Sequence, residues 1–128
     1  MTRAKLPVAI VDDDVSVSTF VAEILSDWGY TVAIFDGPDA LTRARKTQRF
    51  LAVVLDLAMP DMDAFELLNT LPDDNSMEPV VIASSMPATV IVAAHTICRV
   101  KGIQVLGAFS KPLQQGDLNQ LRQSLSQL

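Results

Sequence analysis

The sequence predicts an α/β protein built on one parallel sheet with helices on both faces. Five short apolar runs, each of strand length, alternate along the chain with segments in which apolar residues recur at helical spacing. The runs show no polar alternation, which is typical of strands that are buried on both faces. Because parallel neighbours need right-handed crossover connections, we expect a doubly wound sheet of five strands in the order 2-1-3-4-5.

The first half of the chain contains two strand–helix units. Residues 8–11 form the first strand, and the helix after it is expected to begin at a capping Asp14 and to end at Gly29. Residues 31–35 form the second strand, and a more polar helix is expected over about 40–47. The basic residues of this helix are expected to be solvated: Arg43, Arg45 and Lys46.

The third strand, residues 51–55, runs directly into Asp56. Pro60 cannot continue a strand because it lacks a backbone donor, so the strand has to end near this carboxylate. A short helix over 65–71 follows, and Pro72 closes it. An aspartate at the end of a strand opens a turn or caps a helix more often than it has a catalytic or binding role. A functional role for Asp56 therefore has to be argued together with other residues.

The last two units repeat the pattern. Residues 80–83 form the fourth strand, residues 90–100 form an apolar helix that Gly102 ends, and residues 104–109 form the fifth strand. The final helix is predicted from a stripe made of Leu118, Leu121 and Leu125. Five such units in this order predict a flavodoxin-like (βα)5 fold.

The composition fits one domain over residues 1–128, since 49% of the residues are hydrophobic. A net charge of −5 and 5% aromatic residues argue against a nucleic-acid-binding face. The single cysteine, Cys98, excludes an internal disulfide, and no apolar run is long enough for a secretion signal or a membrane span. We therefore expect a cytoplasmic domain, either alone or at the N-terminus of a longer protein.

Polar residues stand at the ends of four predicted strands. Asp12 and Asp13 follow the first strand, Asp56 the third, Ser84 the fourth and Lys111 the fifth. The carboxyl ends of parallel strands meet at one edge of the sheet, where open α/β sheets bind ligands. Packing does not explain four polar ends on otherwise apolar strands.

The charges at this edge predict a cation site. Two carboxylates about 4 Å apart repel by roughly 4 kcal/mol at an effective dielectric constant near 20, so three clustered acids need a cation. Oxygen ligands without His or Cys favour Mg²⁺ over zinc. A carboxylate nucleophile, a divalent metal, the charge of Lys111 and the hydroxyl of Ser84 are the parts needed to bind and transfer a phosphoryl group.

Four motifs in this order resemble the receiver domain of two-component response regulators, and the resemblance covers essentially the whole chain. They are Val11–Asp14, Asp56 with Met59–Asp63, Pro79–Ser84 and Lys111–Pro112. The resemblance implies a signalling switch in which Asp56 accepts phosphate from a partner histidine kinase or histidine phosphotransfer protein.

The resemblance also implies a metal site and a switch. Mg²⁺ would be held by Asp13, Asp56 and the backbone carbonyl of Ala58, and Asp12 would act through water. Ser84 would be the hydroxyl that moves toward the phosphate. Lys111 would pair with a phosphate oxygen, and the peptide bond from Lys111 to Pro112 would be cis.

Two departures from the family pattern concern the response to phosphorylation. Ala64 replaces the usual glycine, at a cost of about 1 kcal/mol if the turn needs a positive φ. Ala108 replaces the usual aromatic switch residue, and Phe109 next to it should point to the opposite face of the sheet. The aromatic half of the usual switch is therefore expected to be absent.

Two apolar positions predict a long-lived phosphorylated state. Ala58 and Met86 occupy positions that tune dephosphorylation in the family, and neither side chain can orient an attacking water. Ala58 also argues against a haloacid dehalogenase-type phosphohydrolase, which uses a second acid two residues after its nucleophile. We therefore expect a regulatory domain and not an enzyme.

Two further expectations concern partners. The surface formed by the fourth helix, the fifth strand and the fifth helix would carry the output and could form a homodimer. Residues 93–102, 105–107 and 111–113 are similar to receivers that precede EAL-type cyclic-diguanylate phosphodiesterase domains, which suggests a C-terminal effector. The competing hypothesis is a receiver-like interaction module that never uses phosphate; Ala64 and Ala108 keep it open.

Overall fold

The strands and helices alternate along the whole of residues 6–128, the part of the chain that the computed structural model describes. The strands are β1 (Val8–Val11), β2 (Val32–Phe35), β3 (Ala52–Leu55), β4 (Val80–Ser84) and β5 (Val105–Ser110). The helices are α1 (Val15–Asp27), α2 (Pro38–Ala44), α3 (Ala64–Asn69), α4 (Ala88–Val100) and α5 (Gln115–Ser126). Residues 1–5 of the expected domain lie outside the described residues.

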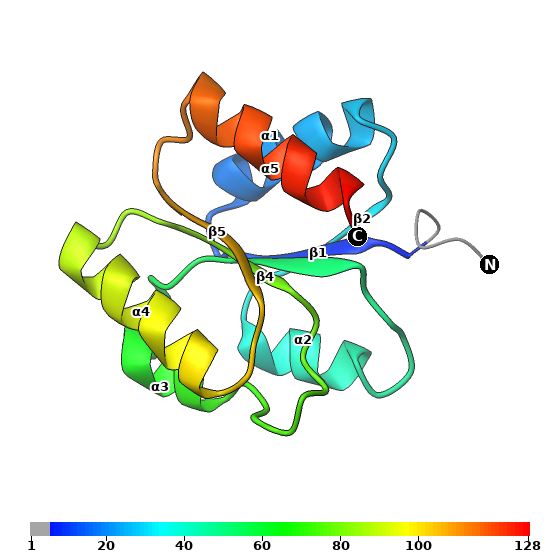
Figure 1. Ribbon diagram of the computed structural model, residues 1–128. Helices are drawn as coiled ribbons and strands as arrows, with labels where there is room; N and C mark the ends of the chain where they lie inside the picture. The colour runs from blue at the N-terminus through cyan, green and yellow to red at the C-terminus, as the bar shows by residue number, and fades with distance from the viewer. Residues whose placement is uncertain (1–5) are drawn as a thin grey trace.

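The strands form one parallel sheet in the order β2-β1-β3-β4-β5, which confirms the predicted topology (Figure 1). Val11 at the end of β1 pairs with Leu55 at the end of β3. The Asp56 N–H donates to the Val11 carbonyl at 3.0 Å. The two predicted acid-bearing strand ends are therefore direct neighbours.

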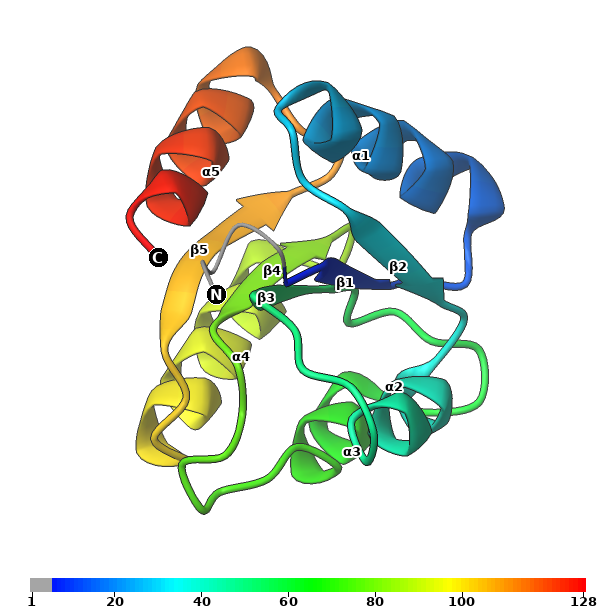
Figure 2. The ribbon, with the colours of Figure 1, turned by 90° about the vertical axis from the view of Figure 1, so that its right-hand side faces the viewer.

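The helices cover both faces of the sheet, as Figure 2 shows: α1 and α5 lie on one side, and α2, α3 and α4 on the other. Successive residues of β3 divide between two cores, since Val53 and Leu55 pack toward α3 and α4 whereas Ala52 and Val54 pack toward α1 and α5. This burial on both faces explains the continuous apolar runs. Within residues 6–128, no helix has the length and apolar character needed to cross a bilayer.

Helix ends agree with the predicted signals. The Asp14 carboxylate accepts the N–H groups of Ser16 and Val17 at 3.0 and 3.3 Å, and it thereby caps α1. Gly29 and Gly102, which follow α1 and α4, have φ angles of +97° and +77°. These are left-handed conformations that glycine adopts without strain.

The predicted starts of two helices are wrong by a few residues. α2 begins at Pro38, because a proline suits the first turn of a helix, where its missing N–H is not needed; the helix ends at Ala44, before the predicted end. α4 begins at Ala88, directly after Pro87, whose carbonyl accepts the N–H groups of Val90 and Ile91.

The expectation that the basic face of α2 is solvated is wrong for one residue. Arg45 is half-buried, and its Nε lies 2.8 Å from a carboxylate oxygen of Glu78. A second guanidinium nitrogen donates to the Ser76 carbonyl at 2.8 Å. Arg45 therefore ties α2 to the segment before β4, while Arg43 and Lys46 are exposed as predicted.

Candidate functional site

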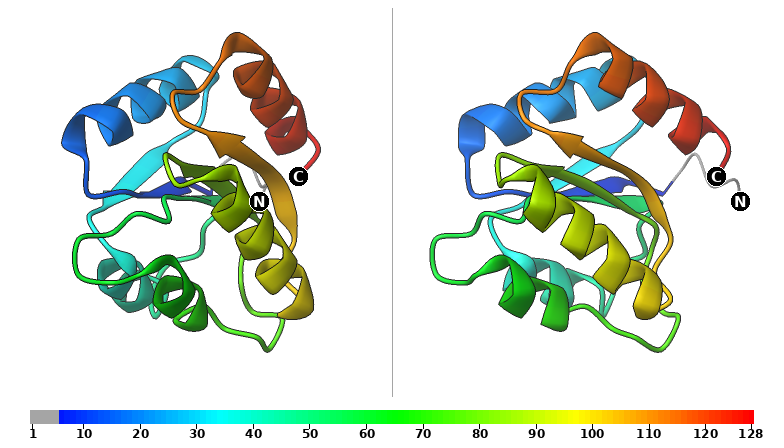
Figure 3. Two further views of the ribbon diagram at one scale, coloured as in Figure 1. Left: turned by 90° about the vertical axis from the view of Figure 1, so that its left-hand side faces the viewer. Right: turned by 60° about the vertical axis from the view of Figure 1, so that its left-hand side comes forward.

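Three acids from neighbouring strand ends form the site. One carboxylate oxygen from each of Asp12, Asp13 and Asp56 lies within 4.8 Å of the other two. Asp12 and Asp56 are only 5% and 6% exposed, whereas Asp13 is exposed. The loops that follow β1 and β3, which carry these acids, lie at the same edge of the sheet in both views of Figure 3.

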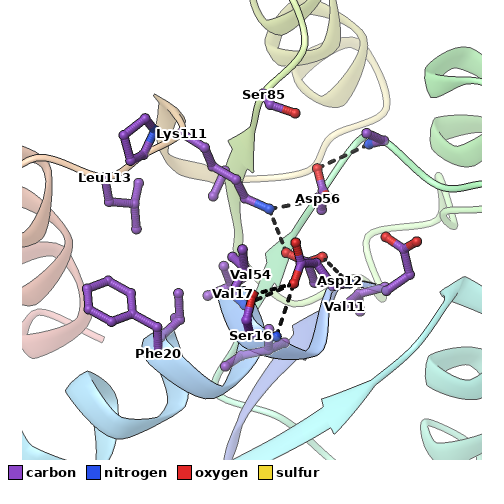
Figure 4. A pocket seen from close by; sticks show the side chains of 17 residues that line it. Val11, Asp12, Ser16, Val17, Phe20, Val54, Asp56, Ser85, Lys111 and Leu113 are labelled. Atoms are coloured by element: carbon purple, nitrogen blue, oxygen red, sulfur yellow. Dashed lines mark hydrogen bonds and ion pairs between the residues drawn. The ribbon is translucent and has the colours of Figure 1, made fainter.

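Lys111 joins the two buried acids, as the dashed lines in Figure 4 show. Its Nζ lies 2.6 Å from Asp12 Oδ2 and 3.3 Å from Asp56 Oδ2. The Lys111 backbone N–H donates to the Ser84 carbonyl at 2.9 Å, so the end of β5 is attached to the end of β4. The structure thus brings the predicted lysine to the predicted acids.

Each buried carboxylate is also held by its own loop. Asp56 Oδ1 accepts the Ala58 N–H at 3.1 Å, and Asp12 Oδ1 accepts the Asp14 N–H at 2.9 Å. Both are bonds to the residue two positions on, a common device by which Asp starts a turn. The second oxygen of each acid remains directed to Lys111.

Burial raises the pKa of the Asp56 carboxyl above its usual value. The hydrogen bond from Ala58 and the charge of Lys111 act in the opposite direction, and the charge of Asp12 adds to the effect of burial. The net direction is upward, so the ionised acid is less favourable here than in water. A bound cation would relieve this cost.

The donor set fits Mg²⁺. Three carboxylates and one ammonium leave a formal charge of −3 + 1 = −2 at the cluster, and the cluster contains neither His nor Cys. Carboxylate oxygens are the ligands that Mg²⁺ prefers. The structure thus supports a divalent-cation site at the place that the sequence predicts.

The two serines at the end of β4 take different places: Ser84 is the last residue of the strand, and Ser85 follows it. Ser84 is fully buried, and its hydroxyl accepts the Met86 N–H at 3.1 Å. Ser85 lines the cavity beside the acids (Figure 4), whereas Ser84 does not. From the sequence, Ser84 is expected to supply the hydroxyl of the site and Ser85 has no role; no sequence signal shows which of two neighbouring serines faces the cavity.

The acids open into a cavity of about 680 Å³. Its polar end holds Asp12, Asp13, Asp56 and Lys111, together with the Asp14 cap. The other end is apolar and lies between α1 and the segment after β5; it is lined by Val17, Phe20, Val21, Pro112 and Leu113. This apolar end is not predictable from the sequence, because Val17 and Phe20 belong to a helical apolar stripe that indicates only packing.

The two departures from the family pattern have different outcomes. Among the described residues, Asn75 is the only non-glycine with a positive φ, so Ala64 is not strained; it starts α3 behind an Asp63 cap. Ala108 packs toward the α4 side and Phe109 toward the α5 side, which confirms that the two side chains face opposite ways. The Lys111–Pro112 peptide bond is cis, as the resemblance to the family implies.

Phe109 has its own packing arrangement. The side chain is 6% exposed, and its ring lies over the backbone of Gly107 on the same strand. A Cβ at position 107 would lie 2.6 Å from the Cζ atom of Phe109. Only a glycine leaves room for the ring in this position, so the aromatic group next to the site belongs to the α5 side of the sheet.

Comparison with known proteins identifies the class. The family described as the response regulator receiver domain matches residues 8–123. The chain is 36% identical over 86 residues to the transcriptional regulatory protein ZraR of Salmonella typhimurium, which covers 66% of this chain and 19% of ZraR. It is 38% identical over 105 residues to the response regulator receiver protein Anae109_2439 of Anaeromyxobacter, covering 81% and 42% of the two chains.

Solved structures of response regulators also superimpose on the chain. A response regulator from Colwellia psychrerythraea superimposes with a TM-score of 0.76 at 29% identity, covering 96% of this chain and 98% of that one. Full-length FixJ from B. japonicum gives a TM-score of 0.76 at 25% identity, with 97% and 59% covered.

The chain belongs to the response regulator receiver domains, the regulatory modules of two-component signal transduction. It spans about a fifth of the length of ZraR. The resemblance predicted from the four motifs is therefore confirmed at the level of family and fold.

Proposed function

We propose that this domain is a phosphoacceptor switch and that Asp56 receives the phosphoryl group. The carrying observation is the position of Asp56: it is buried at a strand end, lines an open cavity, and lies 3.3 Å from the Lys111 ammonium. An ionised carboxylate in this place can act as a nucleophile, and the neighbouring charges can stabilise the phosphoryl oxygens.

In the proposed reaction, a carboxylate oxygen of Asp56 attacks phosphorus, and the bond from phosphorus to the donor breaks. Mg²⁺ held by Asp13, Asp56 and the Ala58 carbonyl, with Asp12 acting through water, would supply positive charge to the phosphoryl oxygens. Lys111 would exchange its contact with Asp56 for one with a phosphoryl oxygen.

Ser84 is the proposed reporter of the phosphorylated state. Its hydroxyl accepts the Met86 N–H, so a move toward the phosphoryl group has to break this 3.1 Å bond. That change would shift the segment between β4 and α4. The surface formed by α4, β5 and α5 would carry the signal onward, either to an effector or to a second copy of the chain.

The donor and the output are further parts of the proposal. The donor would be a histidine kinase or a histidine phosphotransfer protein. Similar proteins include a transcriptional regulatory protein and the N-terminal domain of a response regulator/sensory box/GGDEF protein, so a C-terminal effector suits this chain as well. An EAL-type effector is the specific candidate. A cytoplasmic location is proposed, and the buried thiol of Cys98 suits a reducing compartment.

The experiment is phosphorylation with acetyl phosphate, followed by intact mass spectrometry. We expect a gain of one phosphoryl group in the presence of Mg²⁺ and none with EDTA or in the Asp56→Asn variant. Asp61→Asn is the matched control, because Asp61 is an exposed acid in the same loop and lies outside the cluster. An unmodified wild type under these conditions would contradict the proposal.

A second candidate function is an interaction module that works without phosphate. The small side chain of Ala108 favours it, because an aromatic group in this position is part of the usual response. Under this alternative, Asp56→Asn leaves the affinity for an output partner unchanged. Labelling of Asp56 together with a change in that affinity would exclude it.

A further inference from the structure

The cavity beside Asp56 continues past the acids into an apolar arm (Figure 4). The arm is the apolar end of the cavity, lined by residues of α1 and of the segment after β5: Val17, Phe20, Val21, Pro112 and Leu113. These side chains carry no charge, and the same cavity extends past Lys111 to the acids (Figure 4). The arm and the acid cluster thus belong to one continuous space.

Phosphoryl uptake alone does not need this arm. A phosphoryl group and a cation require charged and polar partners, and the acid end provides them. The whole cavity, about 680 Å³, has the size of pockets that bind small organic molecules. Phe20 is 52% exposed although it lines the arm, so an apolar ligand could cover its ring.

We propose that the apolar arm is a leaving-group subsite, which makes the domain prefer acyl phosphate donors whose acyl group is a flat apolar ring. The inference rests on the proposed function, because it assigns a donor preference to the same site. Among acyl phosphate donors, the aromatic ones meet both ends of the cavity: the phosphoryl group would face Asp56 and Lys111, and the ring would face Phe20 and Leu113.

The reaction balances without another reagent. A carboxylate oxygen of Asp56 forms a bond to phosphorus, and the bond from phosphorus to the acyl oxygen breaks. The bonding pair leaves with that oxygen as an aromatic carboxylate. One carboxylate is consumed and one is released, so no proton or electron has to be supplied.

The experiment measures the phosphorylation rate with two donors in each variant. The ratio of the two rates is then compared between variants, so that the intrinsic reactivity of each donor cancels. Initial rates of phosphorylation are followed with benzoyl phosphate and with acetyl phosphate, both below saturation and with Mg²⁺. In Phe20→Ala and Leu113→Ala we expect the ratio of the benzoyl to the acetyl rate to fall by about tenfold, the equivalent of about 1.4 kcal/mol. Phe20→Leu, which keeps an apolar lining, should lose less.

Val15→Ala is the matched control, because Val15 is a 76% exposed residue of α1 that does not line the cavity. It should leave both rates unchanged. If acetyl phosphate labels every variant and the ratio is the same in Phe20→Ala, Leu113→Ala and the wild type, the subsite is overturned while the proposed function stands. If neither donor labels the wild type, the proposed function fails, and the subsite fails with it.

Discussion

The Nζ atom of Lys111 lies 2.6 Å from Asp12 Oδ2, and this is the closer of its two carboxylate contacts. Asp56 is left with the longer contact of 3.3 Å. The ammonium therefore lies closer to the acid that is not the proposed nucleophile, while Asp56, which lines the cavity, has the longer of the two ion pairs. A divalent cation at the cluster has to share the Asp12 oxygens with Lys111.

Lys111→Met should tighten Mg²⁺ binding, because it removes a positive charge that competes for the Asp12 oxygens. We expect the dissociation constant to fall by about tenfold, a modest part of the interaction between charges at this distance. Isothermal titration of the unphosphorylated domain measures it. Lys46→Met removes an exposed lysine of the segment after α2 and should have no effect; equal or weaker binding in Lys111→Met would contradict the competition.

Asp56→Asn should stabilise the metal-free domain at neutral pH. Because burial raises the pKa of Asp56 in the folded state, the favourable contribution of the protonated acid is present below the usual value of 3.8 and is lost as the pH rises through the folded pKa. The stability gap between the variant and the wild type should therefore widen as the pH rises above 3.8. Urea unfolding in EDTA tests this, and a gap that narrows with rising pH would refute it.

The phosphorylated wild type should lose its phosphoryl group slowly, because Ala58 and Met86 cannot orient water. Placing Asn at 58 and Glu at 86 together should accelerate the loss by about tenfold or more. Decay is followed by intact mass after the donor has been removed. Ala58→Val and Met86→Leu keep both positions apolar and should leave the rate unchanged. Loss of the phosphoryl group within seconds in the wild type, or an unchanged rate of loss in the variant with Asn at 58 and Glu at 86, would contradict this prediction.

Gly107→Ala should destabilise the domain by about 1–3 kcal/mol, because the new methyl group overlaps the packed ring of Phe109. In a Phe109→Leu background the cost should be smaller, and the double-mutant cycle in chemical denaturation measures the coupling. Gly116→Ala is the control: nothing lies within 4 Å of its Cβ position in α5, so it should stabilise the helix by about 0.5–1 kcal/mol. Additive effects at 107 and 109 would exclude the proposed contact.

Much of the site follows from the sequence, because strand ends obey a simple geometric rule. Once the strands are parallel and in the right order, Asp12, Asp56 and Lys111 have to meet at one edge. The opposite orientations of Ala108 and Phe109 follow from the alternation of side chains along a strand in the same way.

Other features depend on packing between segments that are distant in sequence. Three features require the positions of loops that no local sequence pattern specifies. Lys111 lies closer to Asp12 than to Asp56, Ser84 does not line the cavity, and Arg45 forms an ion pair with Glu78. The apolar arm is a similar case, since it exists only where α1 approaches the segment after β5.

Chemical trapping of the modified residue is the most direct test of the phosphoacceptor assignment. The domain is treated with acetyl phosphate and Mg²⁺, reduced with borohydride, which converts an aspartyl phosphate to homoserine, and mapped by peptide mass spectrometry. We expect homoserine at position 56 and at no other acid, and none when EDTA replaces Mg²⁺. Homoserine at Asp12, Asp13 or Asp61 with Asp56 intact, or its absence everywhere, would contradict the assignment.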